Sequence, residues 1–222
     1  MSPPPTHVHA AGGRAFSQEA LRGALSAADP PVRIILVHGN GGASVDGNWF
    51  PSVRQRLDAL GMTVVARNFP DPIKGRARFW LPFLQDEIRP DASSIIVGHS
   101  SGSLVALRYA ESRPLLGSVH VAGHFTDRGF ELERRSGFFD NPFDWAAIRA
   151  NQRFIAQFHS IDDPWIPVEE ARELHRFLAS DYVEMDSEGH FGSYNQEKAE
   201  FPELIDLIVE RLVRLLDPAI VL

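Results

Sequence analysis

Residues 94–110 read SIIVGHSSGSLVALRYA, and this segment is the most informative of the chain. The apolar residues 95–97 are followed by the motif Gly-x-Ser-x-Gly, centred on Ser100, and then by a segment with helical character. Strand, sharp turn and helix are the context in which this motif lifts a serine hydroxyl above the end of a sheet. We expect glycine at 98 and 102 because a Cβ there would collide with the neighbouring strand or helix. The motif predicts that Ser100 is a nucleophile; the plainer alternative is a strand-to-helix turn rich in small residues.

Five further short apolar runs have the composition of buried parallel strands. They lie at residues 32–37, 62–66, 118–121, 154–159 and 182–185. The segments between them repeat apolar residues at helical spacing, most clearly at 53–60, 79–88 and 204–215. Strands that alternate with helices predict a doubly wound, mostly parallel sheet of about six strands with helices on both faces.

Composition indicates an ordinary globular protein. The 222 residues are 44% hydrophobic and 23% charged, and we expect residues 1–15 to be a flexible leader to a single domain over 16–222. The net charge of −7, without a block rich in Lys or Arg, argues against a nucleic-acid partner. The absence of cysteine excludes disulfides and thiol nucleophiles and fits a reducing compartment. Neither a signal peptide nor a membrane span is evident, so we expect a cytoplasmic protein without membrane contact.

Ser100 needs partners, because a serine hydroxyl is a poor nucleophile unless a base takes its proton. In enzymes with this motif, a carboxylate and then a histidine follow the serine along the chain. Asp162 and Asp163 follow the fifth predicted strand, and His190 follows the sixth. We therefore expect all of these groups at the carboxyl ends of strands, where open α/β sheets carry their sites.

Each partner has an alternative. His124 also follows a predicted strand and competes with His190, although the chain order favours His190. Asp162 or Asp163 could be a turn residue, because Asp-Asp-Pro is also a turn signature. The residues alone leave the choice between the two aspartates open.

The negative charge that develops on a carbonyl oxygen needs two backbone N–H donors. We expect one from Ser101, which follows the nucleophile, and the other from Asn40 in the glycine-rich loop HGNGG at residues 38–42. Taken alone, this loop could hold a phosphate, but the chain lacks both the P-loop and the Gly-x-Gly-x-x-Gly patterns. No cluster of His, Asp and Glu has metal-ligand spacing, so we expect neither a metal nor a cofactor.

Residues 122–151 form one long irregular segment rich in aromatic residues, which is unusual in a compact domain without a function. The plainer interpretation is that its rings fill the core beneath a loop. We expect instead a short lid over Ser100 that supplies an apolar substrate pocket. Phe139 and Trp145 of this segment, with Trp165, are the predicted lining residues.

Several motifs together resemble a known family. They are GNGG at 39–42, NFPDP at 68–72, WLPF at 80–83, the serine motif at 98–102, RYAE at 108–111, DDP at 162–164 and GHF at 189–191. In these motifs the chain is similar to the small serine hydrolases related to retinoblastoma-binding protein 9, a compact branch of the α/β-hydrolase superfamily. The match runs from about residue 32 to 216, nearly the whole chain apart from the leader.

The resemblance implies an α/β-hydrolase fold and a catalytic triad of Ser100, Asp163 and His190. It also implies hydrolysis of small ester or amide substrates, short peptides included, since aminopeptidase-like activity is known among relatives. The Leu-x-Cys-x-Glu motif behind the mammalian member's name needs a cysteine, so we expect no binding of the retinoblastoma protein here. The competing hypothesis is a binding or scaffold protein that keeps the fold without catalysis.

Overall fold

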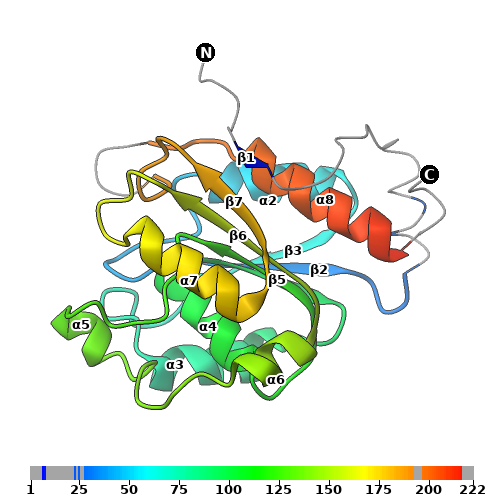
Figure 1. The fold of residues 1–222 in the computed structure, drawn as a ribbon. Coiled ribbons are helices and arrows are strands. Elements are labelled where there is room, and N and C mark those ends of the chain that lie inside the picture. Colours follow the sequence, from blue (N-terminus) through cyan, green and yellow to red (C-terminus); the bar gives the residue numbers. More distant parts are fainter. Residues whose placement is uncertain (1–6, 9–22, 24, 26–27, 193–196, 217–222) are drawn as a thin grey trace.

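The structure is a computed structural model that describes residues 7–8, 23, 25, 28–192 and 197–216 (Figure 1). Its strands are β1 (His7–Val8), β2 (Arg33–Val37), β3 (Thr63–Ala66), β4 (Ser94–His99), β5 (Leu115–Val121), β6 (Gln152–Ser160) and β7 (Asp181–Met185). They form one sheet in the order β1-β7-β6-β5-β4-β2-β3. Strands β2 to β7 pair in parallel, which confirms the predicted doubly wound sheet of six parallel strands.

Helices cover both faces of the sheet (Figure 1). On one face lie α2 (Phe50–Ala59) and α8 (Pro202–Leu216); on the other lie α3 (Ala77–Pro82), α4 (Ser101–Ala110), α6 (Trp145–Ala150) and α7 (Val168–Leu178). Successive side chains of a strand point to opposite faces, so the sheet separates two apolar cores. In β2, Ile34 and Leu36 pack in the core that includes α2 and α8, whereas Ile35 and Val37 pack in the core that includes α4.

The helix predicted over residues 79–88 is divided in two. Helix α3 contains Pro82 at its end, and the next residues form a π-helical turn, η1 (Phe83–Ile88). Proline has no N–H to donate and its ring clashes with the carbonyl four residues earlier. The wider register of η1 accommodates this break.

The short antiparallel strand β1 was not predicted. Of residues 1–15 the structure describes only His7 and Val8, which pair with Glu184 and Val183 at the edge of the sheet. A pairing of two residues leaves no periodic pattern in the sequence, and the rest of the expected leader lies outside the described residues. No helix in the described ranges is both long and apolar enough to cross a membrane.

The winding of the chain reverses at β2, next to the edge strand β3. Strand β2 lies between β3 on one side and β4 on the other. Open α/β sheets have a crevice at the carboxyl ends of the strands where the order reverses. The ends of β2 and β4, at Val37 and His99, therefore define the region in which a site is expected.

The backbone is packed most closely where β4 meets α4. A Cβ on Gly98 would lie 2.5 Å from the carbonyl oxygen of Gly102. A Cβ on Gly102 would lie 2.4 Å from the carbonyl oxygen of Val37 in β2. Both contacts are with rigid backbone, so only glycine fits at either position, as the sequence predicts.

We expect Gly102→Ala to destabilise the protein by about 1–3 kcal/mol, because α4 must move away from β2 to admit the methyl group. Gly47→Ala is the matched control, since no atom lies within 4 Å of a Cβ at Gly47, and its effect should stay within about 0.5 kcal/mol. Urea unfolding of both variants measures the difference. Equal stability of the two variants would contradict the close packing of α4 on β2.

Candidate active site

Ser100 occupies a strained turn between β4 and α4. Its backbone has φ 54° and ψ −124°, which is uncommon for a residue with a side chain. The N–H of Ser100 donates to the carbonyl of Val121 at the end of β5 (2.9 Å), and its carbonyl accepts from the N–H of Ser103 in α4 (2.9 Å). The turn is thus held from both the sheet and the helix.

His190 and Asp163 meet although 27 residues separate them. The Nδ1–H of His190 donates to Oδ2 of Asp163 at 2.8 Å, and Oδ1 of Asp163 accepts from the N–H groups of Trp165 (2.9 Å) and Ile166 (3.1 Å). Burial raises the pKa of the Asp163 carboxyl, but the bonds from His190, Trp165 and Ile166 outweigh it, so the pKa lies below its ordinary value. Asp163 is therefore ionised at neutral pH. A neutral His190 that donates through Nδ1 has Nε2 free to accept a proton.

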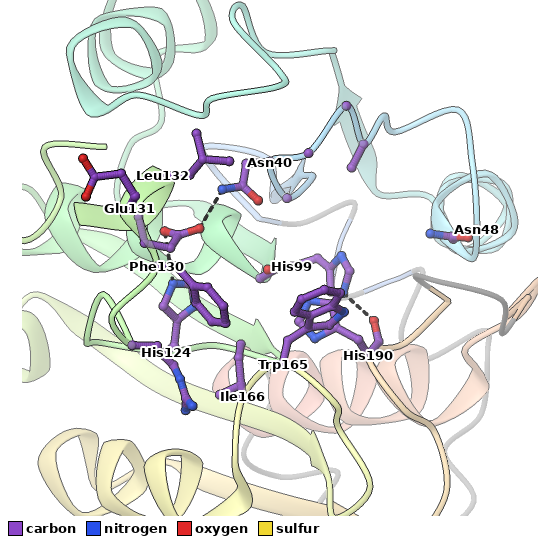
Figure 2. Close-up of a pocket in the computed structure, with 17 residues that line it drawn as sticks. Asn40, Asn48, His99, His124, Phe130, Glu131, Leu132, Trp165, Ile166 and His190 are labelled. Carbon is purple, nitrogen blue, oxygen red and sulfur yellow. Dashed lines mark hydrogen bonds and ion pairs between the residues drawn. The ribbon is translucent and has the colours of Figure 1, made fainter. Parts of the chain in front are cut away.

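Neighbouring groups hold the loop that carries His190. The Nε2–H of His99 donates to the carbonyl of His190 at 2.9 Å (Figure 2). Burial, with a contribution from His190, lowers the pKa of His99 to about 3, so His99 is neutral. The indole N–H of Trp49 donates to the carbonyl of Phe191 (3.1 Å), and Oδ1 of Asp162 accepts from the N–H of Gly189 (2.8 Å).

The two aspartates differ in their contacts. Asp162 also accepts from Oγ of Ser160 (2.5 Å) and forms a turn at the end of β6. It is exposed, whereas the side chain of Asp163 is fully buried against His190. Asp163 therefore makes the contact with His190, whereas Asp162 links the turn after β6 to the loop that carries His190.

The glycine-rich loop passes directly over the strained turn. A Cβ on Gly39 would lie 3.1 Å from Cβ and 3.6 Å from Oγ of Ser100, so this glycine permits close approach. Within the described residues, the backbone N–H groups of Asn40 and Ser101 donate to no protein acceptor. Because these N–H groups flank the turn, the loop and the start of α4 can together bind a developing oxyanion.

A cavity of about 690 Å³ opens above Ser100. Its walls come from the glycine-rich loop, from the segment around α5 (Glu131–Arg134), and from the residues after Asp163 (Figure 2). Three exposed apolar side chains line it, namely Phe130 (45% exposed), Leu132 (52%) and Trp165 (38%). Such a volume and lining suit a small substrate with an apolar group.

Phe139 and Trp145, predicted as pocket residues, are not among the residues that line this cavity. The ring of Trp145 stacks on Phe177 of α7 at 4.8 Å, and Phe139 lies behind His124 with ring centroids 5.9 Å apart. Both rings pack against the core, because the chain turns away from the cavity after α5. Trp165 lines the cavity, and its role in substrate binding stays a prediction.

The sequence gives no sign of a partly buried carboxylate that lines the cavity, Glu133. Oε1 of Glu133 accepts from Nδ2 of Asn40 (2.6 Å) and Oγ of Ser101 (3.2 Å), the two residues that flank the turn at Ser100. His124, the alternative to His190, lies on the other side of this carboxylate, with Nε2 3.5 Å from Oε2 of Glu133. Glu133 lies in the irregular segment, where spacing gives no sign of what a side chain faces.

A second carboxylate fixes the start of the same segment. Glu170 of α7 accepts from the N–H groups of Phe125 (3.0 Å) and Thr126 (2.9 Å) and pairs with Nη1 of Arg128 (2.8 Å). Arg128 also lines the cavity. In the part of the chain that the structure describes, no group of three His, Asp or Glu side chains has the geometry to hold a metal ion.

Two comparisons with known proteins both match this chain to serine hydrolases. A model of the family described as "Serine hydrolase" matches residues 34–209. "Serine hydrolase RBBP9" of Rattus norvegicus is 39% identical over 184 residues, which cover 82% of this chain and 96% of that protein.

Solved structures give the same fold. The ydeN gene product of Bacillus subtilis superposes with a TM-score of 0.72 at 24% identity, over 81% of this chain and 98% of that one. Alpha/beta hydrolase domain-containing protein 10 from mouse superposes with a TM-score of 0.58 at 14% identity, over 84% of this chain and 90% of that one. At these identities the likeness concerns the fold, which is that of the α/β hydrolases.

Trp145 packs among other rings and Phe130 is exposed in the cavity, so removing each ring should lower the free energy of unfolding by a different amount. Trp145→Ala should lower the free energy of unfolding by about 1–3 kcal/mol, since the ring is half-buried among other rings. Phe130→Ala should lower it by less than about 1 kcal/mol, because that ring is exposed in the cavity. Urea unfolding measures both, and a larger loss in Phe130→Ala would contradict the assignment of the rings.

Proposed function

The chain belongs to the serine hydrolase family, and from this premise we propose that it cleaves small ester or amide substrates through a covalent acyl-enzyme. In this proposal Ser100 is the nucleophile, His190 the general base and then acid, and Asp163 the residue that holds His190. The contact of 2.8 Å between His190 and Asp163, beside a strained Ser100, is the observation that supports it most strongly. No cofactor is required by these steps.

The reaction follows from the roles of these groups. Nε2 of His190 takes the proton of Ser100 as Oγ attacks the carbonyl carbon, and the N–H groups of Asn40 and Ser101 stabilise the oxyanion. Asp163 keeps His190 in the Nδ1–H tautomer and stabilises the imidazolium that forms. His190 then gives the proton to the leaving alcohol or amine, and a water, activated in the same way, releases the acid and restores Ser100.

The cavity supports a preference for substrates with an apolar acyl group. Phe130, Leu132 and Trp165 offer aromatic and aliphatic surface above Ser100. Aromatic or medium aliphatic groups beside the scissile carbonyl would bury this surface. We therefore propose activity of the carboxylesterase or aminopeptidase type, with esters and amides of such acids as the substrates to test.

Several sequence-based expectations stay predictions. They are a cytoplasmic location, the absence of nucleic-acid and membrane partners, and the absence of retinoblastoma-protein binding. A small-molecule ester, an amide or a short peptide remains the expected partner of the site.

Labelling with a fluorophosphonate, which reacts only with an activated serine, tests the nucleophile. We expect Ser100→Ala to abolish labelling and to lower kcat by on the order of 10⁴–10⁶, while circular dichroism shows an intact fold. Ser101→Ala should be far milder, because only its backbone N–H has a catalytic role. Equal loss in the two variants would contradict the assigned nucleophile, and a wild type that neither labels nor hydrolyses esters would favour the scaffold hypothesis.

Variants of the two neighbouring aspartates test which of them orients His190. Asp163→Asn should lower kcat by up to about 10⁴, the effect of the same change in a serine protease, because an amide favours the wrong tautomer of His190. Asp162→Asn should lower kcat by about tenfold or less, since it removes a turn contact. Both variants are compared on one activated ester after their fold has been checked. A larger loss in Asp162→Asn would reverse the assignment.

A further inference from the structure

Glu133 of α5 lies beside the active site, and the proposed mechanism does not use it. Its side chain is 13% exposed. Oε1 accepts from Nδ2 of Asn40 at 2.6 Å, the bond drawn as a dashed line in Figure 2, and from Oγ of Ser101 at 3.2 Å. Asn40 belongs to the glycine-rich loop and Ser101 begins α4, so the two donors flank the strained turn at Ser100. One carboxylate oxygen therefore links both sides of this turn.

The two residues that Glu133 links are the ones whose backbone N–H groups are assigned to the oxyanion. Such a donor is effective only when it lies about 2.7–3.1 Å from the position that the oxygen takes in the transition state. A hydrogen bond to the side chain of Asn40 or Ser101 restrains the backbone of the same residue. Glu133 can therefore control the direction of both N–H groups without contacting the substrate.

The glycine-rich loop supplies few restraints of its own. Gly41 and Gly42 have φ of 72° and 87°, and a Cβ at either position would meet no atom within 4 Å. Glycine leaves the backbone a wide choice of conformations. The N–H groups of Gly41 and Gly42 donate to the carbonyls of residues 72–73, which fixes the loop only after Asn40. Among the described residues, the bond to Glu133 is the one hydrogen bond that the side chain of Asn40 makes.

The segment that carries Glu133 is itself anchored on both sides. Before α5, Glu170 accepts from the N–H of Phe125 at 3.0 Å. After α5, Nε of Arg108 donates to the carbonyl of Phe138 at 2.9 Å. Both anchors come from long helices, α7 and α4, that pack on the sheet. Glu133 therefore projects from a fixed support and can hold the loop in place.

The charge of Glu133 does not itself favour the reaction. Burial raises the pKa of its carboxyl, but the contacts with His124, Asn40 and Ser101 outweigh burial and hold the pKa below its ordinary value. An ionised carboxylate is a strong acceptor for its two donors. A negative charge near a developing oxyanion is also repulsive. The hydrogen bonds of Glu133, rather than its charge, are therefore the feature that can assist catalysis.

We propose that Glu133 is a positioning residue, which holds Asn40 and Ser101 so that their backbone N–H groups point at the oxyanion above Ser100. This inference rests on the proposed function. Interactions that strengthen only in the transition state raise kcat, whereas those made equally with the bound substrate lower KM. Loss of Glu133 should therefore lower kcat and leave KM nearly unchanged.

The first test measures kcat and KM for p-nitrophenyl butyrate. We expect Glu133→Ala to lower kcat by about 10- to 100-fold, less than the loss of a whole oxyanion donor, with KM within about twofold. Glu133→Gln should recover kcat to within about threefold of the wild type. Its amide oxygen can accept from Asn40, and its amide N–H can donate to Nε2 of His124. Asp140→Ala is the control, an exposed carboxylate of the same segment outside the cavity lining, and should leave both constants within about twofold.

Two results of this test would overturn the proposal. A raised KM with unchanged kcat in Glu133→Ala would mean that Glu133 contacts the substrate. A loss in Glu133→Gln as large as in Glu133→Ala would mean that the charge, and not the hydrogen bonds, is what matters. A wild type that neither labels with the fluorophosphonate nor hydrolyses the ester would instead fail the proposed function itself.

The second test separates positioning from a smaller folded fraction. An alkyl trifluoromethyl ketone reacts with an active Ser100: Oγ bonds to the carbonyl carbon, the carbonyl electron pair becomes an oxyanion, and His190 keeps the proton. We expect its Ki to rise by about 10- to 100-fold in Glu133→Ala, in step with the fall in kcat. A variant with fewer folded molecules has a lower apparent kcat but an unchanged Ki. An unchanged Ki would therefore overturn the proposal.

A double variant tests whether Glu133 acts through Asn40. Asn40→Ala removes the shorter of the two hydrogen bonds and should also lower kcat. Because both single variants break this bond, Asn40→Ala combined with Glu133→Ala should lose less than the product of the two single losses. Losses in kcat that multiply in full would show that the two side chains act independently, and would overturn the proposal.

Discussion

The close approach of α4 to β2 and β4 constrains everything around Ser100. Gly98 and Gly102 allow backbone atoms to pack where a Cβ would lie within 2.5 Å of a carbonyl oxygen. The chain can leave β4 and enter α4 at this distance only through a tight turn, and Ser100 therefore takes a positive φ. The hydrogen bonds of Ser100 to Val121 and Ser103 hold this strained conformation. The same geometry orients the first N–H groups of α4 toward the space above the sheet, where the positive end of the helix dipole favours a developing negative charge.

The remaining groups reach that space because parallel strands end at one edge of the sheet. Asp163 follows β6 and His190 follows β7, yet their side chains meet at 2.8 Å. Their loops are held by buried neighbours, His99 and Trp49, and by the turn at Asp162. Preorganisation of this kind lets the site stabilise charge without reorganising during the reaction.

Much of this architecture could be predicted from the sequence, for a physical reason. Buried parallel strands are continuous apolar runs, and the serine motif needs its two glycines, so both are visible without a structure. Chain order and strand ends predict that His190 approaches one of two adjacent aspartates, and the resemblance to the family selects Asp163. No periodic pattern shows which way the rings of the irregular segment 122–151 face. Trp145 packs against the core, whereas Phe130 lines the cavity. Glu133 and strand β1 were missed for the same reason, because their contacts are made with distant residues and leave no periodic pattern.

The central claim is that one strained serine, one buried His–Asp pair and two backbone N–H groups act together on a carbonyl. A crystal structure of the protein after reaction with a fluorophosphonate tests it most directly. We expect phosphorus bonded to Oγ of Ser100, its phosphoryl oxygen about 2.7–3.1 Å from the N–H groups of Asn40 and Ser101, and the His190–Asp163 contact retained. Phosphorus on another side chain, or a phosphoryl oxygen that contacts neither N–H group, would contradict the account.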